Sequence, residues 1–196
     1  KAGTELDLNG HIITATSRFG FGFILSNTGA DTDGLYVYSS KAGAQILATK
    51  DIGFIFGAGD FKDNGTRFIN NAGTLTIGKD KSGRTYPKNL TVKGTCLLSA
   101  VNDTVIDGIV YENSRQDNAG ALQFQFGAAT VTVNNCDFYI YSNRVFAGRY
   151  GSGWKVDVAS SRIYTHRELA HSDHVTTANS GIVTMTDTDI YSLSAI

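Results

Sequence analysis

Four ten-residue stretches in the second half of the chain decide the fold. They read TVIDGIVYEN from Thr104, VTVNNCDFYI from Val131, VDVASSRIYT from Val156 and VTMTDTDIYS from Val183. Each alternates apolar and polar residues, turns at a small residue and alternates again, which is the pattern of two short strands at a corner. Their starts lie 27, 25 and 27 residues apart. This spacing indicates a repeat of three short strands.

A third alternating segment precedes each of the last three stretches. These segments are LQFQF at Leu122, RVFAG at Arg144 and HVTTA at His174, and each precedes a corner of small residues. The strands, corners and spacing together predict an all-β chain folded as a parallel β-helix, in which each rung of three strands buries its neighbour. We expect a single domain over residues 1–196.

The repeat is regular over residues 90–196 and irregular over residues 1–89, where long loops separate the rung strands. LDLNGHIITA from Leu6 and LTVKGTCLLS from Leu90 also fit the template, and GLYVYSS, DIGFIFGAG and AGTLTIGKD are predicted as strands. The step from Leu90 to Thr104 is only 14 residues, so either Leu90 begins a different face or the register slips there. The predicted inward columns are Leu6, Val131, Val156 and Val183; Leu8, Ile106, Val133, Val158 and Met185; and Ile13, Tyr111, Phe138, Ile163 and Ile190.

Composition supports strands and turns and argues against several classes of partner. The chain has 22 Gly, 21 Thr, 15 Asp and only 3 Glu, a bias away from helix formers. The net charge of −1 argues against nucleic-acid binding, which needs a basic excess. No apolar run approaches the roughly 18 residues of a membrane span. We expect no cofactor, and we expect Cys96 and Cys136 to be free thiols.

The repeats DTVIDGIVYENS and TVTVNNCDFYIYS resemble the right-handed parallel β-helix (pectin-lyase-like) superfamily, which includes pectate lyases, phage tailspikes and bacterial adhesins. The opening GTELDLNGHIITATS is similar to the first coil of viral tailspikes. The resemblance implies a tailspike- or fibre-like module of a virion or cell surface, and such spikes are often homotrimers. The last template ends near Ile190 and the chain at Ile196, so we expect a segment of a longer chain or a subunit capped by a partner.

Three functions stay open, because this superfamily hosts enzymes, adhesins and inert scaffolds. The first is a rigid, non-enzymatic module that binds a surface glycan. The second is a polysaccharide lyase or hydrolase, and the third is a capsid decoration or cement protein. The chain lacks the paired-Asp motifs of polygalacturonase-like members and the Arg-bearing proline motif of pectate lyases, which favours a non-enzymatic role.

Tyr139, Tyr164 and Tyr191 each follow an inward residue of the template. In-register stacking would place them about 4.8 Å apart on one outward face. One interpretation is a platform for sugar rings, since aromatic faces pack against C–H groups. The other is a stabilising aromatic ladder or a contact between subunits, for which a homotrimer is the expected assembly.

Two sets of charged residues also recur along the repeat. Arg115, Arg144 and Arg167 are predicted at the same corner of successive rungs, where guanidinium groups suit an acidic polysaccharide. Alternatively, nearby acidic residues neutralise them, namely Glu112, Asp117 and Glu168. An outward column of Asp137, Arg162 and Asp189 alternates in sign, and this predicts a surface salt-bridge ladder.

The densest polar cluster is the segment THRELAHSDHV, predicted as a long loop. Its candidate catalytic residues are His166, Arg167, Glu168, His171, Asp173 and His174. Histidine and carboxylate pairs can bind zinc or manganese, or can act with arginine as base and charge stabiliser in polysaccharide cleavage. The spacing matches no defined motif, so we assign no metal site, and a solvated loop is the third interpretation.

Overall fold

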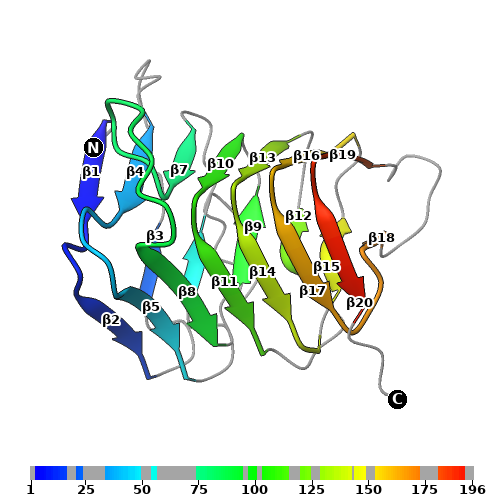
Figure 1. Cartoon of the computed structure of the whole chain (residues 1–196), viewed down its shortest axis with the longest axis horizontal. Helices are drawn as coiled ribbons and strands as arrows, with labels where there is room; N and C mark the ends of the chain where they lie inside the picture. Colours follow the sequence, from blue (N-terminus) through cyan, green and yellow to red (C-terminus); the bar gives the residue numbers. More distant parts are fainter. Residues whose placement is uncertain are drawn as a thin grey trace, which may run out of the picture.

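The computed structural model describes residues 3–16, 21–23, 34–49, 54–56, 74–94, 97–100, 103–114, 120–124, 129–142, 144–148, 153–172 and 181–192. Every regular element within these ranges is a β-strand, and neighbouring strands run parallel in three sheets (Figure 1). The all-β prediction is therefore confirmed for the described residues. No helix of the length and hydropathy needed to span a bilayer occurs among them.

The three sheets are built from strands that alternate along the chain. Sheet A contains β1 (Thr4–Asp7), β4 (Leu35–Tyr38), β7 (Leu75–Ile77), β10 (Thr104–Asp107), β13 (Thr130–Asn134), β16 (Lys155–Ala159) and β19 (Ile182–Thr186). Sheet B contains β2 (Ile12–Ala15), β5 (Ala44–Ala48), β8 (Leu90–Gly94), β11 (Val110–Asn113), β14 (Asp137–Ile140), β17 (Arg162–Thr165) and β20 (Asp189–Ser192). Sheet C contains β3 (Phe21–Phe23), β6 (Phe54–Phe56), β9 (Leu97–Ala100), β12 (Gly120–Phe124), β15 (Arg144–Gly148) and β18 (Ala170–Ser172).

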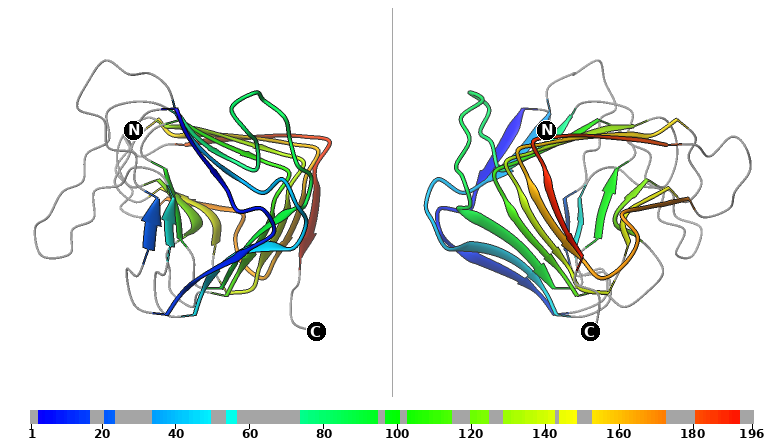
Figure 2. Two further views of the ribbon diagram at one scale, coloured as in Figure 1. Left: turned by 90° about the vertical axis from the view of Figure 1, so that its left-hand side faces the viewer. Right: turned by 45° about the vertical axis from the view of Figure 1, so that its right-hand side comes forward.

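The chain visits sheets A, B and C in turn, so each strand pairs with the strand three elements further along. We call one passage through the three sheets a circuit. The left-hand view of Figure 2, turned by 90° from Figure 1, shows the sheets arranged around a common interior. Alternate residues point inward because successive side chains of a strand face opposite ways.

The inward columns follow the strand pairing. Phe138 pairs with Tyr111 and Ile163, and Ile163 pairs with Ile190. Tyr111 is fully buried and satisfies its hydroxyl by donating to the Ala121 carbonyl at 2.7 Å. Ile13 is joined to Tyr111 through Ile46 and Val92 of the intervening strands, so the predicted column from Ile13 to Ile190 is confirmed.

The predicted position of Leu6 and Leu8 is wrong by two residues. Leu6 pairs with Val37, and the column continues through Ile77 to Ile106 and Val133 rather than to Val131. The reason is the corner between β1 and β2, which spans residues 8–11, whereas the corner between β13 and β14 spans only residues 135–136. A template that assumes corners of equal length therefore cannot align the residues of the first circuit with those of the later circuits.

Leu90 begins a different face, which resolves the short step to Thr104. It opens β8 of sheet B, whereas Thr104 opens β10 of sheet A. The template fit at Leu90 is therefore wrong, although GLYVYSS, DIGFIFGAG and AGTLTIGKD do contain β4, β6 and β7.

The third strand of the circuit after β17 also differs from the prediction. The structure places it at β18, where Ala170 pairs with Phe146. This segment was expected to be part of a loop, and the short corner after β17 explains the earlier start. The predicted segment HVTTA from His174 lies outside the described residues.

From β10 onward, each corner between sheets A and B has two residues. The first has a positive φ, and these residues are Gly108 (68°), Asn135 (52°), Ser160 (49°) and Asp187 (47°). Gly adopts this left-handed region freely, and Asn and Asp tolerate it better than most residues. In the last three corners, the side chain of the second residue donates a hydrogen bond to the backbone carbonyl two residues earlier. The donors are Cys136 Sγ, Ser161 Oγ and Thr188 Oγ1, at 3.1, 2.7 and 2.9 Å.

The corner between β7 and β8 is longer and forms a tongue, residues 78–89, that folds back on the sheets. Lys79 and Thr85 form an antiparallel bridge within it. The Tyr86 ring stacks on Tyr38 with centroids 5.3 Å apart. The tongue places Lys88 beside the next corners, where its N–H donates to the Gly108 carbonyl at 2.6 Å.

Candidate functional site

Three rows of side chains run along the outer surface of sheet B and its corner with sheet A. Each row takes one residue from each of three successive circuits. The corner row is Asn135, Ser160 and Asp187; the charged row is Asp137, Arg162 and Asp189; the tyrosine row is Tyr139, Tyr164 and Tyr191. We call them together the three-row face. Its regularity follows from the parallel in-register pairing of β14, β17 and β20.

The tyrosine row is a continuous stack of rings. Tyr139 and Tyr164 have ring centroids 4.7 Å apart and planes 7° apart, and Tyr164 and Tyr191 have values of 4.6 Å and 11°. The predicted column and its spacing are confirmed. Because the rings lie against one another, the inner ring faces are covered and the row presents its edges, while Tyr191 is 44% exposed. Burial raises the pKa of Tyr139, and the charge of Asp189 raises the pKa of Tyr191.

The charged row contains one well-formed ion pair. Arg162 donates from Nε to Asp137 Oδ1 and from Nη2 to Asp137 Oδ2, both at 2.8 Å. Lys88 Nζ lies 3.3 Å from the same Oδ2. Burial acts to raise the pKa of Asp137, but hydrogen bonds from Arg162 and the charge of Lys88 outweigh it, so that pKa is lowered. The predicted ladder is thus confirmed between Asp137 and Arg162, whereas Asp189 accepts a hydrogen bond from the Tyr191 hydroxyl at 3.5 Å.

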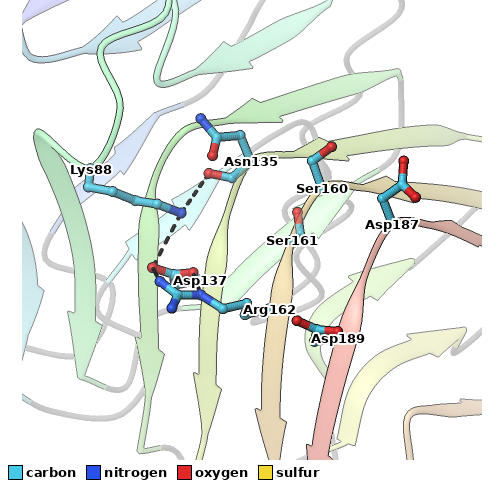
Figure 3. Close-up of a pocket in the computed structure, with 8 residues that line it drawn as sticks. All are labelled: Lys88, Asn135, Asp137, Ser160, Ser161, Arg162, Asp187 and Asp189. Carbon is cyan, nitrogen blue, oxygen red and sulfur yellow. Dashed lines mark hydrogen bonds and ion pairs between the residues drawn. The ribbon is translucent and has the colours of Figure 1, made fainter.

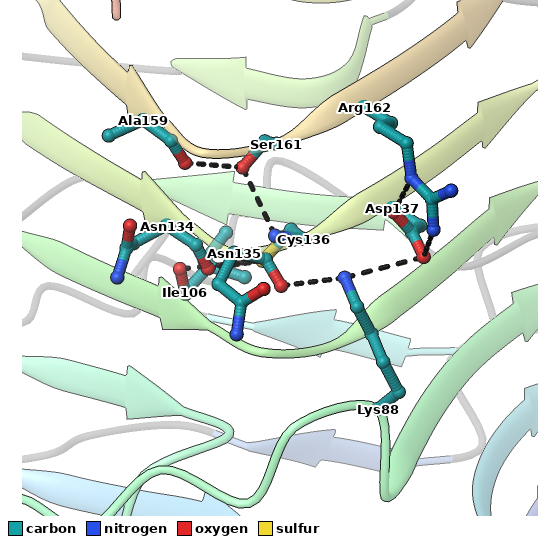
Figure 4. A network of polar contacts seen from close by, with 9 residues as sticks. All are labelled: Lys88, Ile106, Asn134, Asn135, Cys136, Asp137, Ala159, Ser161 and Arg162. Atoms are coloured by element: carbon teal, nitrogen blue, oxygen red, sulfur yellow. Dashed lines mark hydrogen bonds and ion pairs between the residues drawn. The ribbon is translucent and has the colours of Figure 1, made fainter. Parts of the chain in front are cut away.

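A polar network beneath the rows holds the corner in place (Figure 4). Lys88 Nζ donates to the Asn135 carbonyl at 2.6 Å. Ser161 Oγ accepts from the Cys136 N–H at 3.1 Å and donates to the Ala159 carbonyl at 2.7 Å. Cys136 is a buried free thiol, as predicted, and its burial raises the pKa to about 12. The second predicted thiol, Cys96, lies outside the described residues.

The corner and charged rows line a shallow pocket of about 410 Å³, with Lys88 of the tongue at one side (Figure 3). Figure 3 shows Asn135, Ser160 and Asp187 beside the charged row. The lining residues are Lys88, Asn135, Asp137, Ser160, Ser161, Arg162, Asp187 and Asp189. The pocket therefore offers amide, hydroxyl, carboxylate and guanidinium groups. Four of its residues lie in the two-residue corners between sheets A and B.

The arginines predicted at one corner do not form a column. Arg144 opens β15, and its Nε lies 3.3 Å from Glu168 Oε2 of the next circuit. Arg167 lies in the exposed corner after β17, where its N–H donates to Thr165 Oγ1 at 3.1 Å. The pairing of β15 with β18 brings Glu168, not Arg167, beside Arg144, which explains the error. Neutralisation by Glu168 is confirmed for Arg144, and Arg115 lies outside the described residues.

The predicted catalytic cluster is spread along a corner and a strand. His166, Arg167 and Glu168 are consecutive and exposed. His171 lies in β18, paired with Ala147, whereas Asp173 and His174 lie outside the described residues. Within the part of the chain that the structure describes, no group of three His, Cys, Asp or Glu side chains could hold a metal ion.

The sequence reasoning missed the pocket because half of it comes from corner positions. Asn135, Ser160 and Asp187 recur at the same template position, and this recurrence was the available signal. Lys88 does not recur in the template, because it belongs to the tongue. Comparison with protein-family models, with curated proteins and with solved structures finds no match to this chain.

Proposed function

We propose that the chain is a right-handed parallel β-helix that serves as a rigid, non-enzymatic module of a virion or cell surface and binds a surface carbohydrate on its three-row face. The cyclic order of strands through three parallel sheets supports this architecture. Crossovers between parallel strands of one sheet are right-handed in about 98% of cases, which supports the hand. Each circuit rests on the previous one, so the stack is a stiff support for a surface site.

The observation that carries the binding function is the pocket flanked by stacked tyrosines. Saccharides offer dense hydroxyl groups beside apolar C–H faces. The amide of Asn135, the hydroxyl of Ser160 and the carboxylates of Asp187 and Asp189 can all accept hydrogen bonds from hydroxyls. The outermost ring, Tyr191, can pack against C–H groups because nearly half of it is exposed.

The ionisation of Asp137 argues against this residue as the general acid of a glycosidase. A glycosidase needs one carboxyl group whose pKa is raised, so that it can donate a proton to the leaving oxygen. Asp137 has a lowered pKa and accepts hydrogen bonds from Arg162 on both oxygens. It is therefore held as a carboxylate and is poorly suited to act as a general acid.

The test compares Tyr164→Ala with Tyr141→Ala on immobilised glycans. Tyr164 lies in the middle of the stack, whereas Tyr141 is 45% exposed and lies in the corner after β14, outside the tyrosine row. We expect the wild type and Tyr141→Ala to retain a glycan and Tyr164→Ala to lose it. Tyr164→Ala removes ring contacts with both Tyr139 and Tyr191, each worth about 0.5–1.5 kcal/mol, so its thermal transition should fall by several degrees and remain cooperative.

Light scattering in the same experiment separates the other functions. A subunit interface at the tyrosine row, for example in a homotrimer, predicts that Tyr164→Ala dissociates the oligomer without a glycan effect. A decrease in polysaccharide mass over time would indicate a depolymerase and overturn the non-enzymatic proposal. Glu168→Gln should leave glycan retention unchanged, since Glu168 lies in the corner after β17 and contacts Arg144.

A further inference from the structure

The pocket on the three-row face has an excess of one negative charge among its lining side chains. Its lining contains two cationic side chains, Lys88 and Arg162, and three carboxylates. Both cations are directed at Asp137: Arg162 donates two hydrogen bonds to it and Lys88 lies 3.3 Å away. Asp137 therefore lies between both cations, and with three carboxylates against two cations the lining has a net charge of −1.

The remaining two carboxylates face solvent. Asp187 is the exposed first residue of its corner, and Asp189 is the exposed first residue of β20. They lie on the same circuit, one in the corner row and one in the charged row (Figure 3). A ligand in the pocket would therefore meet these carboxylates together with the neutral side chains of Asn135 and Ser160.

Arg162 can still donate hydrogen bonds to a neutral ligand while it is paired with Asp137. A guanidinium has five N–H donors, and the contacts to Asp137 use two of them. The side chain is half exposed, so the other N–H groups can reach hydroxyl oxygens. An anionic ligand would have to compete with Asp137 for Arg162 and would be repelled by Asp187 and Asp189.

We propose that this pocket selects neutral saccharides and rejects acidic ones such as uronic-acid polymers. The inference rests on the proposed carbohydrate function and adds the ligand class to it. The carboxylates of Asp187 and Asp189 accept hydrogen bonds from sugar hydroxyls, and the same two charges exclude a ligand carboxylate. Acidic polysaccharide was the ligand expected from an arginine column, and the pairing of Arg144 with Glu168 removes that argument.

The experiment uses an array of neutral and uronic-acid-containing glycans, probed with the wild type, Asp187→Asn and Ser142→Asn. Asparagine tolerates the left-handed backbone of position 187, where φ is 47°. Ser142 lies outside the pocket and provides a matched surface control. We expect the wild type and Ser142→Asn to bind neutral glycans only. Asp187→Asn should raise binding of acidic glycans relative to neutral ones by roughly two- to fivefold, the effect of one screened charge pair.

The outcomes separate the two proposals. If the wild type binds glycans but prefers acidic ones, or if Asp187→Asn leaves the ratio of acidic to neutral binding unchanged, the selectivity is wrong and the carbohydrate function stands. If the wild type binds no glycan of either class, the proposed function fails and the selectivity fails with it. Raising the salt concentration should narrow the gap between acidic and neutral glycans, because salt screens exposed charges.

Discussion

Arg162 and Asp137 lie 25 residues apart in the chain and form a two-point ion pair across adjacent circuits, with both N–O distances at 2.8 Å. The pair joins the first residues of β17 and β14, which are also paired in the sheet. It therefore links the register of the strands to the electrostatics of the pocket. Lys88 adds a second cation from the tongue, 3.3 Å from Asp137.

Asp137→Asn should lower the free energy of unfolding by about 1.5–3 kcal/mol at neutral pH, the range for a hydrogen bond to a charged group. The pKa of Asp137 is lowered in the folded protein. Its contribution is therefore present above the unfolded pKa of about 4 and is lost as the pH falls through the folded value. Urea unfolding of both proteins at pH 7 and pH 3 should show a difference in the free energy of unfolding that is smaller at the lower pH. A gap of equal size at both pH values would contradict this role.

Val133→Asp should unfold the chain, because Val133 is 1% exposed and an unpaired buried carboxylate costs several kcal/mol. Thr132→Asp is the matched control, since Thr132 is exposed and one position away. The control places a carboxylate opposite Asp157, which should cost only a few tenths of a kcal/mol. Circular dichroism and thermal melting check both. Equal stability of the two variants would show that the register of sheet A is wrong.

Ser160→Gly should raise the free energy of unfolding by up to about 1 kcal/mol, because Ser160 has a φ of 49° and glycine adopts that conformation without strain. Ser160→Val should lower it, since a β-branched residue is poorly tolerated there. Ser161→Gly serves as the neighbouring control and should destabilise, because the Ser161 hydroxyl bridges Cys136 and Ala159. Denaturant unfolding of the three variants measures the order of their free energies of unfolding. A free energy higher than that of the wild type for Ser161→Gly would contradict the predicted order.

Cys136 should be unreactive in the folded protein. Burial raises the pKa of its thiol to about 12, so almost no thiolate is present at pH 8. In a Cys96→Ser variant, a thiol reagent should label Cys136 only after denaturant is added. Because the folded pKa is the higher one, the contribution of this thiol to stability is intact below about pH 8.5 and declines as the pH rises toward 12. Rapid labelling of the native variant would contradict the burial.

The regular half of the fold was accessible from sequence because every corner between sheets A and B has two residues from β10 onward. Columns such as Phe138, Ile163 and Ile190 and the tyrosine row follow directly from a period of 25–27 residues and alternation within strands. The same reasoning failed at Leu6, where the corner is two residues longer. Alternation fixes which residues share a face, but it carries no information on how many residues a corner uses.

The pocket was less accessible, because its members come from different parts of the chain. The charged row was predicted, and the salt bridge between Asp137 and Arg162 bears it out. Lys88 belongs to the tongue of residues 78–89, and its place beside Asp137 depends on how that tongue folds onto the corners. The arginines failed as a column for a similar reason, since one corner decides whether Arg167 or Glu168 lies beside Arg144.

The sequence by itself determined the all-β class, the repeat, the charged row and the tyrosine row, because these follow from residue alternation within strands and from the period of the repeat along the chain. Only the tertiary structure decided which rows form a pocket, which charges neutralise one another and which remain toward solvent. Those outcomes depend on contacts between residues that are close in space and distant in the chain, such as Lys88 with Asn135, 47 residues away.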